Sequence, residues 1–140
     1  AFERAIALRD IRQSDPDFEA VITAAERTAN IVRGPKATEH LVLDPEALSE
    51  PAEKSLFEAY QAAAGAVEAA LSPETERDYQ AAWQALAGLR EPIDNFFDGV
   101  LVMAEDEAVR RNRLALLAAV DDLFLRLLDV QQIVIAGEAD

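Results

Sequence analysis

The sequence predicts an all-α protein, folded as a single bundle of five or six helices. Hydrophobic residues make up 51% of the chain but aromatic residues only 6%, and alanine is the dominant apolar type. Alanine has the highest helix propensity and allows helices to pack closely. Apolar residues recur at spacings of three and four, as in helices with one buried face, and no segment shows the alternation of a strand. With no internal repeat, the length suits one domain over residues 1–140.

The first quarter of the chain predicts two helices before residue 35. One is expected over residues 2–11. Ser14, Asp15 and Pro16 then mark the start of a helix that should reach Arg33, because a side-chain oxygen acceptor followed by proline is typical of helix starts. Its buried stripe should contain Phe18, Ile22, Ala25, Ala29 and Val32. The opposite stripe should contain Thr23, Glu26, Arg27, Asn30 and Arg33.

The middle of the chain predicts a connection and two further helices. Residues 35–43 form the connection, which holds His40, the only histidine. Helix starts follow at residues 44–45 and 49–51, and the second leads into an alanine-rich helix over residues 52–71. Ser72 and Pro73 should cap the next helix, which carries Trp83 as a core anchor and should stop before Pro92.

The most specific stretch, residues 91–117, predicts two helices that meet at a corner. Pro92 suits the first turn of a helix. After Gly99 and a short apolar run, the acids at 105–107 indicate the start of the last helix, expected over residues 106–129 and largely buried at the centre of the bundle. Three arginines follow within about one turn: Arg110, Arg111 and Arg113.

No pattern of catalytic or metal-binding residues accompanies these helices. Cysteine is absent, the serines lie mostly at helix starts, and no glycine-rich phosphate loop is present. Asp94 and Asp98 share a helix face and offer, as an alternative, half of a Mg²⁺-diphosphate motif. Such a site needs further oxygen ligands, which no second helix of this kind supplies. We therefore expect neither a catalytic site nor a metal site in this chain.

Charge and hydropathy limit the partners. With 27 acids against 13 Lys plus Arg, the net charge is −14, so RNA would have to be bound by a local patch. No segment has the ~20 apolar residues that span a bilayer, and no basic stretch leads into an apolar one as in a signal peptide, so we expect no membrane partner. The absence of cysteine suits a cytoplasmic protein. The chain begins at Ala1 rather than methionine, and we expect a fragment of a longer protein.

Three ordered blocks resemble one family, the β subunit of bacterial tetrameric glycyl-tRNA synthetase. Residues 92–117 are similar to its succession of Pro-Val-Asp, Phe-Phe-Asp, a Val/Met-rich run, Glu-Asp and Arg-x-Asn-Arg-Leu. Residues 26–32 are similar to its Lys-Arg-x-x-Asn-Ile-Leu, and residues 123–129 to its closing helix. The resemblance covers about Phe2 to Val130. The departures are Ile93, Leu101 and Glu26, of which Glu26 reverses a charge.

The resemblance implies a C-terminal domain like the anticodon-binding domain of arginyl-tRNA synthetase, in contact with the anticodon of glycine tRNA. It also implies that glycine is activated on a separate α subunit, which this domain reaches through the rest of the β subunit. ATP and Mg²⁺ would belong to the whole synthetase, and this domain would need no cofactor. The chain would then position tRNA(Gly) and catalyse nothing by itself.

Single-stranded RNA loops are read by stacking and by hydrogen bonds to base edges. Glycine anticodons contain two adjacent cytosines, and a carboxylate accepts a hydrogen bond from the cytosine N4 amino group, a role we predict for Asp98. Phosphate contacts are predicted for Arg110, Arg111 and Arg113, with Arg27, Asn30 and Arg33 on a nearby face.

Several alternatives remain open at this point. Arg110 and Arg113 would brace the corner if they paired with Asp94 or Asp98, and Asn30 would cap a neighbouring helix. We expect Phe96 and Phe97 to be core residues. The whole chain would then be an acidic helical module that docks protein and never touches RNA.

Overall fold

The computed structural model describes residues 9–33, 41–72 and 78–127, and it confirms the all-α prediction. Its α-helices follow a helical segment at residues 9–14, with a 3-10 turn at Pro45–Ala47 between the first two of them. The α-helices are α2 (Phe18–Val32), α3 (Pro51–Ala70), α4 (Tyr79–Ala87), α5 (Arg90–Gly99) and α6 (Glu107–Leu127). The described ranges contain no strand. Residues 2–8 of the helix predicted over 2–11, residues 35–40 of the connection, with His40, and residues 128 and 129 of the last predicted helix lie outside them.

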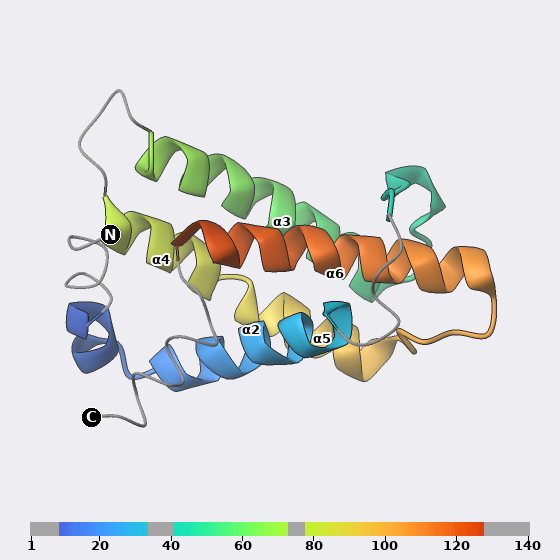
Figure 1. Cartoon of the computed structure of the whole chain (residues 1–140), viewed down its shortest axis with the longest axis horizontal. Coiled ribbons are helices and arrows are strands. Elements are labelled where there is room, and N and C mark those ends of the chain that lie inside the picture. The colour runs from blue at the N-terminus through green and yellow to red at the C-terminus, as the bar shows by residue number, and fades with distance from the viewer. Residues whose placement is uncertain (1–8, 34–40, 73–77, 128–140) are drawn as a thin grey trace.

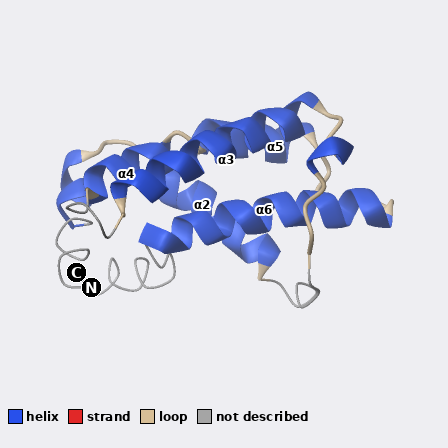
Figure 2. Cartoon of the chain, turned by 90° about the horizontal axis from the view of Figure 1, so that it is seen from above, coloured by secondary structure: helices blue, strands red, loops and turns tan. Residues whose placement is uncertain are grey.

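The helices form two layers that run along the long axis of the molecule (Figures 1 and 2). Helices α3, α4 and α5 lie in one layer, and α2 and α6 lie in the other. The start of α6, the start of α3 and the end of α5 gather at one end of the bundle, on the right in Figure 1. This end carries the predicted corner between α5 and α6. No helix of the described ranges is both long and apolar enough to cross a bilayer.

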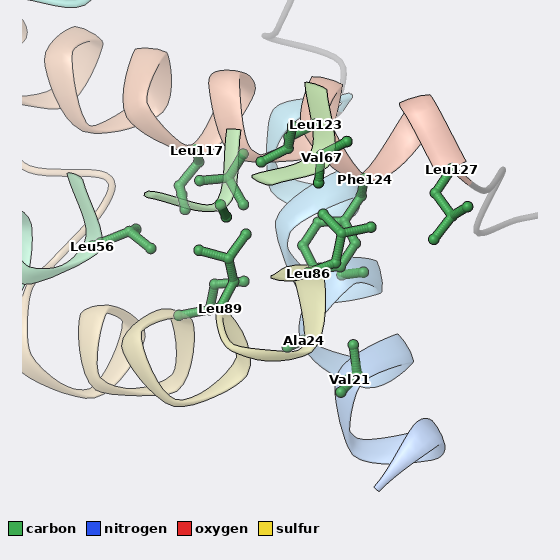
Figure 3. Close-up of a cluster of buried hydrophobic side chains, with 14 of the residues drawn as sticks. Val21, Ala24, Leu56, Val67, Leu86, Leu89, Leu117, Leu123, Phe124 and Leu127 are labelled. Carbon is green, nitrogen blue, oxygen red and sulfur yellow. The ribbon is translucent and has the colours of Figure 1, made fainter. Parts of the chain in front are cut away.

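The core lies between the two layers and is built mainly from leucine, valine and alanine (Figure 3). Helix α6 is central, as predicted, because it packs against α2, α3 and α4. Its side chains Leu116, Leu117, Val120 and Leu127 are 0% exposed. Trp83 of α4 is also buried, stacked on Phe18 with ring centroids 4.8 Å apart, and its Nε1 donates to Asp15 Oδ2 at 2.7 Å. The prediction of Trp83 as a core residue is confirmed.

Aspartate side chains accept hydrogen bonds from backbone nitrogens two or three residues later and so mark the helix starts. These starts do not always lie where the sequence predicted them. Pro16 lies in the turn before α2 and not in its first turn, because Asp15 Oδ1 accepts a hydrogen bond from the Asp17 backbone nitrogen at 2.8 Å. Asp78, not Ser72, caps α4: its Oδ1 accepts from the Ala81 nitrogen at 2.9 Å. Pro92 lies in the first turn of α5, as expected.

Candidate nucleic-acid interface

Arg113, predicted to bind phosphate, is instead the side chain that ties the corner together. Its Nε donates to Glu53 Oε2 at 3.1 Å and its Nη1 donates to the Leu101 carbonyl at 2.7 Å. The Arg113 side chain is only 12% exposed and that of Glu53 only 3%. Arg113 therefore joins α6 both to the start of α3 and to the loop after α5, and we leave it out of the exposed RNA surface.

Glu53 is the buried counter-charge on which this arrangement depends. Burial by itself would raise the pKa of Glu53, but hydrogen bonds from the Glu50 backbone, Arg113 and the Ser49 backbone outweigh it and hold that pKa below its ordinary value. The Glu50 and Ser49 nitrogens donate to Glu53 Oε1 at 2.8 and 3.2 Å, at the open N-terminus of α3. The Glu53 carboxylate thus accepts hydrogen bonds both from the backbone nitrogens at the start of α3 and from Arg113 of α6.

Arg110 and Asn112 fasten neighbouring loops to the first turns of α6. Arg110 Nη1 donates to the Ala104 carbonyl at 3.1 Å. The buried Asn112 accepts from the Asp44 nitrogen at 2.8 Å and donates to the Asp44 carbonyl at 3.0 Å. The alternative that Arg110 and Arg113 brace the corner is therefore right in outline but wrong in its partners, which are carbonyl groups and Glu53 instead of Asp94 or Asp98.

Asn112→Ala should destabilise the fold by about 2 kcal/mol, because two hydrogen bonds are lost and nothing replaces the buried amide. Denaturant titration of the variant beside the wild type measures the loss. Asn95→Ala, an exposed asparagine of α5, is the control and should change stability by less than ~0.5 kcal/mol. Equal losses in the two variants would contradict the role of Asn112.

Arg33 is likewise engaged within the protein, in a link between α2 and α6. Its Nε and Nη2 donate to the two carboxylate oxygens of Asp121 at 3.1 and 3.0 Å. The Asp121 side chain is 5% exposed and that of Arg33 is 31% exposed. Burial raises the pKa of Asp121 above its ordinary value, an effect that the hydrogen bonds and charge of Arg33 reduce but do not cancel.

Arg27 lies on a second surface, where α2 meets α5. Its guanidinium carbon is 4.3 Å from the centroid of the Phe97 ring, a cation–π contact. Arg27 Nη1 is also 4.0 Å from Asp94 Oδ1, and Arg90 Nη1 is 3.4 Å from Asp94 Oδ2. We call the Arg27 guanidinium together with the Phe97 ring the Arg27–Phe97 shelf. Phe96 is a fully buried core residue, whereas Phe97 is half-buried and packs against the core from its edge.

The remaining predicted side chains are exposed. The side chains of Asn30 and Asp98 form no hydrogen bond or ion pair with other residues of the described ranges, so the suggested capping role of Asn30 is not seen there. Arg111 Nη1 is 3.7 Å from Glu107 Oε1, one turn earlier on α6. The structure thus separates the predicted set into an α2–α5 face with Arg27, Asn30 and Asp98, and a corner with the three arginines of α6.

The described ranges contain no group of three or more His, Cys, Asp or Glu side chains placed to hold a metal ion. Asp94, half of the alternative Mg²⁺ motif, is instead shared between Arg27 and Arg90. Its charge is offset by cations of the protein itself.

Two functional partners, Glu53 and Asp121, were missed by the sequence reading, although each had a signal. Glu53 stands three residues after Glu50, the N-cap residue of α3, and this is the spacing of a capping box. Asp121 interrupts the apolar band of α6 next to Val120, and an acid in such a band predicts a buried cationic partner.

Comparison with known proteins places these observations in a family. A family model described as the DALR anticodon binding domain matches residues 21–135. The chain is 42% identical over 132 residues to the glycine–tRNA ligase beta subunit of Desulforudis audaxviator, covering 94% of this chain and 18% of the relative. It is 44% identical over 118 residues to the same subunit of Geotalea uraniireducens, covering 84% of this chain and 16% of the relative.

A third relative, the glycine–tRNA ligase beta subunit of one Acinetobacter baumannii strain, is 45% identical over 115 residues, which is 82% of this chain and 16% of the relative. The chain thus spans less than a fifth of the length of these relatives. Because the family model covers well over half of the chain, and the helical bundle agrees with it, the chain belongs to the DALR anticodon binding domain family.

Proposed function

We propose that this chain binds the anticodon arm of glycine tRNA as the anticodon-recognition domain of a bacterial glycine–tRNA ligase β subunit. Membership of an anticodon binding family over residues 21–135 is the observation that carries the proposal. Its relatives named as glycine–tRNA ligase beta subunits supply the choice of tRNA.

In this proposal the domain contributes position and no chemistry. Holding the anticodon arm fixes the orientation of the tRNA, so that its acceptor end reaches a distant active site at a smaller entropic cost. Glycine activation, with ATP and Mg²⁺, would take place on the α subunit of the cytoplasmic ligase. That subunit would be joined to this domain through the rest of the β subunit.

Of the side chains predicted to contact RNA, some are exposed and others are engaged in ion pairs within the protein. Arg27, Asn30, Asp98 and Arg111 are exposed and are proposed to touch RNA, with Asp98 accepting from a cytosine amino group. Arg110 is half-buried and is proposed to reach a phosphate with the part of its guanidinium that does not bind Ala104. Arg33 and Arg113 support these groups indirectly, because each already holds a buried carboxylate.

The test is the affinity of the full ligase for tRNA(Gly), measured by filter binding. Replacing either adjacent anticodon cytosine by uracil should weaken binding about 10-fold or more, because uracil offers an acceptor where cytosine offers an amino donor. Asp98→Asn should reduce that discrimination, and Asp122→Asn, an exposed acid of α6, is the matched control. Equal affinity for both RNAs in the wild type would contradict anticodon recognition by the ligase.

One observation favours a second candidate function, the docking of protein. Leu101 and Met103 of the corner loop are 68% and 44% exposed, and Val109 in the first turn of α6 is 36% exposed. Exposed apolar side chains at such a site are typical of protein contacts. Leu101→Ser together with Met103→Ser would leave tRNA affinity unchanged under this reading but weaken assembly of the ligase, measured by sedimentation.

A further inference from the structure

We infer that the Arg27–Phe97 shelf stacks one unpaired base of the bound RNA, and that it does not hold a phosphate. This inference rests on the proposed function and deepens it, because it names the chemical group that Arg27 takes. A planar guanidinium, already lying on an aromatic ring, offers its second face to another flat group.

The shelf is held in place before any RNA arrives. Phe97 packs edge-on against Phe96, with centroids 6.1 Å apart and ring planes at 86°, and Phe96 is 0% exposed. Asp94 lies 4.0 Å from the Arg27 guanidinium, and Arg90 in turn lies 3.4 Å from Asp94. Rigid support of this kind lowers the entropy lost when a base is bound.

The shelf is also open to solvent. The Arg27 side chain is 49% exposed although Phe97 lies against its guanidinium. About half of the Arg27 side chain is therefore accessible to a ligand. By contrast, the Arg113 side chain is 12% exposed, and its guanidinium is taken up by Glu53 and the Leu101 carbonyl.

The charges around Arg27 decide between a base and a phosphate. Glu26 precedes Arg27 on α2, and Glu91 and Asp98 lie three residues before and four residues after Asp94 on α5. Within the described ranges, neither has the pairing to Arg27 and Arg90 that offsets the charge of Asp94. A phosphate brought to Arg27 would meet this group of carboxylates and be repelled. An uncharged base would not be repelled, and its amino groups would find acceptors. Asn30, three residues after Arg27 on the same face of α2, offers both a donor and an acceptor for a base edge.

The deciding variant is Arg27→Lys, which keeps the charge and a cation–π contact with Phe97 but removes the flat surface. The full ligase is titrated with tRNA(Gly) over a series of salt concentrations. Arg27→Lys should weaken binding about 10-fold, the size of one lost base–side-chain stack. The slope of log affinity against log salt should stay unchanged, because that slope counts neutralised phosphates. Arg126→Lys, a 40% exposed arginine at the far end of α6, is the matched control and should bind as the wild type does.

A second arm identifies the stacked base. Abasic nucleotides are placed in turn at each unpaired position of the anticodon loop. At one position, the abasic RNA should bind the wild type about 10-fold more weakly than intact tRNA does. At that position Arg27→Lys should bind the abasic RNA as tightly as it binds intact tRNA, because its stacking surface is already lost. Phe97→Leu should behave like Arg27→Lys, with thermal unfolding to check that the bundle is intact.

The outcomes separate the two proposals. Wild-type affinity in Arg27→Lys, with a reduced salt slope in Arg27→Ala, would assign a phosphate to Arg27 and overturn the shelf while leaving anticodon binding in place. Additive losses in Arg27→Lys at every abasic position would also overturn it. A wild-type ligase that does not distinguish tRNA(Gly) from tRNA with a changed anticodon would remove the proposed function itself.

Discussion

Glu53→Ala is expected to destabilise the protein by about 3–5 kcal/mol, the loss typical of breaking a buried ion pair by removing one partner. The variant leaves the guanidinium of Arg113 at the corner without its carboxylate and removes the acceptor for the Ser49 and Glu50 nitrogens. Denaturant titration at pH 7 measures the change. We expect tRNA affinity to fall with it, because the start of α6 loses its attachment to α3.

Two controls make this result specific to the buried pair. Glu68→Ala breaks an exposed ion pair with Arg126 on the same two helices and should cost less than ~1 kcal/mol. In the double variant Glu53→Ala with Arg113→Ala, the combined loss should be smaller than the sum of the single losses, because each single change strands the other charge. Simple additivity would show that Glu53 acts only as a helix cap.

Acid titration tests the same carboxylate through its pKa. Glu53 has a folded-state pKa below its ordinary value of 4.5. The stability that it contributes is therefore complete above that value and is lost as pH falls through the lower folded pKa. The difference in unfolding free energy between the wild type and Glu53→Gln should accordingly be largest near neutral pH and shrink below about pH 4.5.

Arg33→Ala is expected to cost about 3 kcal/mol at pH 7, because Asp121 is then buried without a cation. Here the pH dependence has the opposite sign. The folded-state pKa of Asp121 already lies above its ordinary value of 3.8, so the folded state takes up this proton more readily than the unfolded chain. The contribution of Asp121 to the free energy of unfolding thus falls as pH rises above 3.8. Removing Arg33 should raise the pKa further, and the loss should shrink as the solution is made acidic.

The measurement is again denaturant unfolding, at pH 7 and at pH 4.5, with Arg111→Ala as the control on the exposed side of α6. In an Asp121→Asn background the effect of Arg33→Ala should become small and independent of pH, because no buried carboxylate remains. An Arg33→Ala loss that persists unchanged at pH 4.5 would contradict this account of the pair.

Under the proposed function, these buried pairs help an acidic domain to present exposed polar and cationic groups to RNA. Arg33 and Arg113 neutralise carboxylates inside the bundle and fix α2 and α3 against α6. The exposed groups of the α2–α5 face and of the corner are thereby held at fixed positions. In such an arrangement little of the affinity comes from bulk charge, and discrimination among RNA sequences comes from individual side chains.

The sequence alone determined the helices and the family. The spacing of three and four in α2 placed Phe18, Ile22, Ala25 and Ala29 correctly in its buried stripe, because a helix of 3.6 residues per turn places such residues on one face. Val32 and Glu26, predicted buried and exposed, are both half-buried. The ordered motifs between residues 26 and 129 predicted the relationship that the family match shows. Helix starts were less well predicted, as at Ser72, because several residues near each start supply an oxygen acceptor.

Only the tertiary structure decided which arginines are available to a ligand. Arg27 and Arg33 stand on the same predicted polar stripe of α2, and Arg113 follows two other arginines at the start of α6, so the sequence does not set them apart. Arg33 meets Asp121 from 88 positions away, and Arg113 meets Glu53 from 60 positions away. Arg27 instead meets an aromatic ring of α5. The positions at which helices cross set these partners, and a local pattern of residues does not contain the distances between helices that are far apart in the chain.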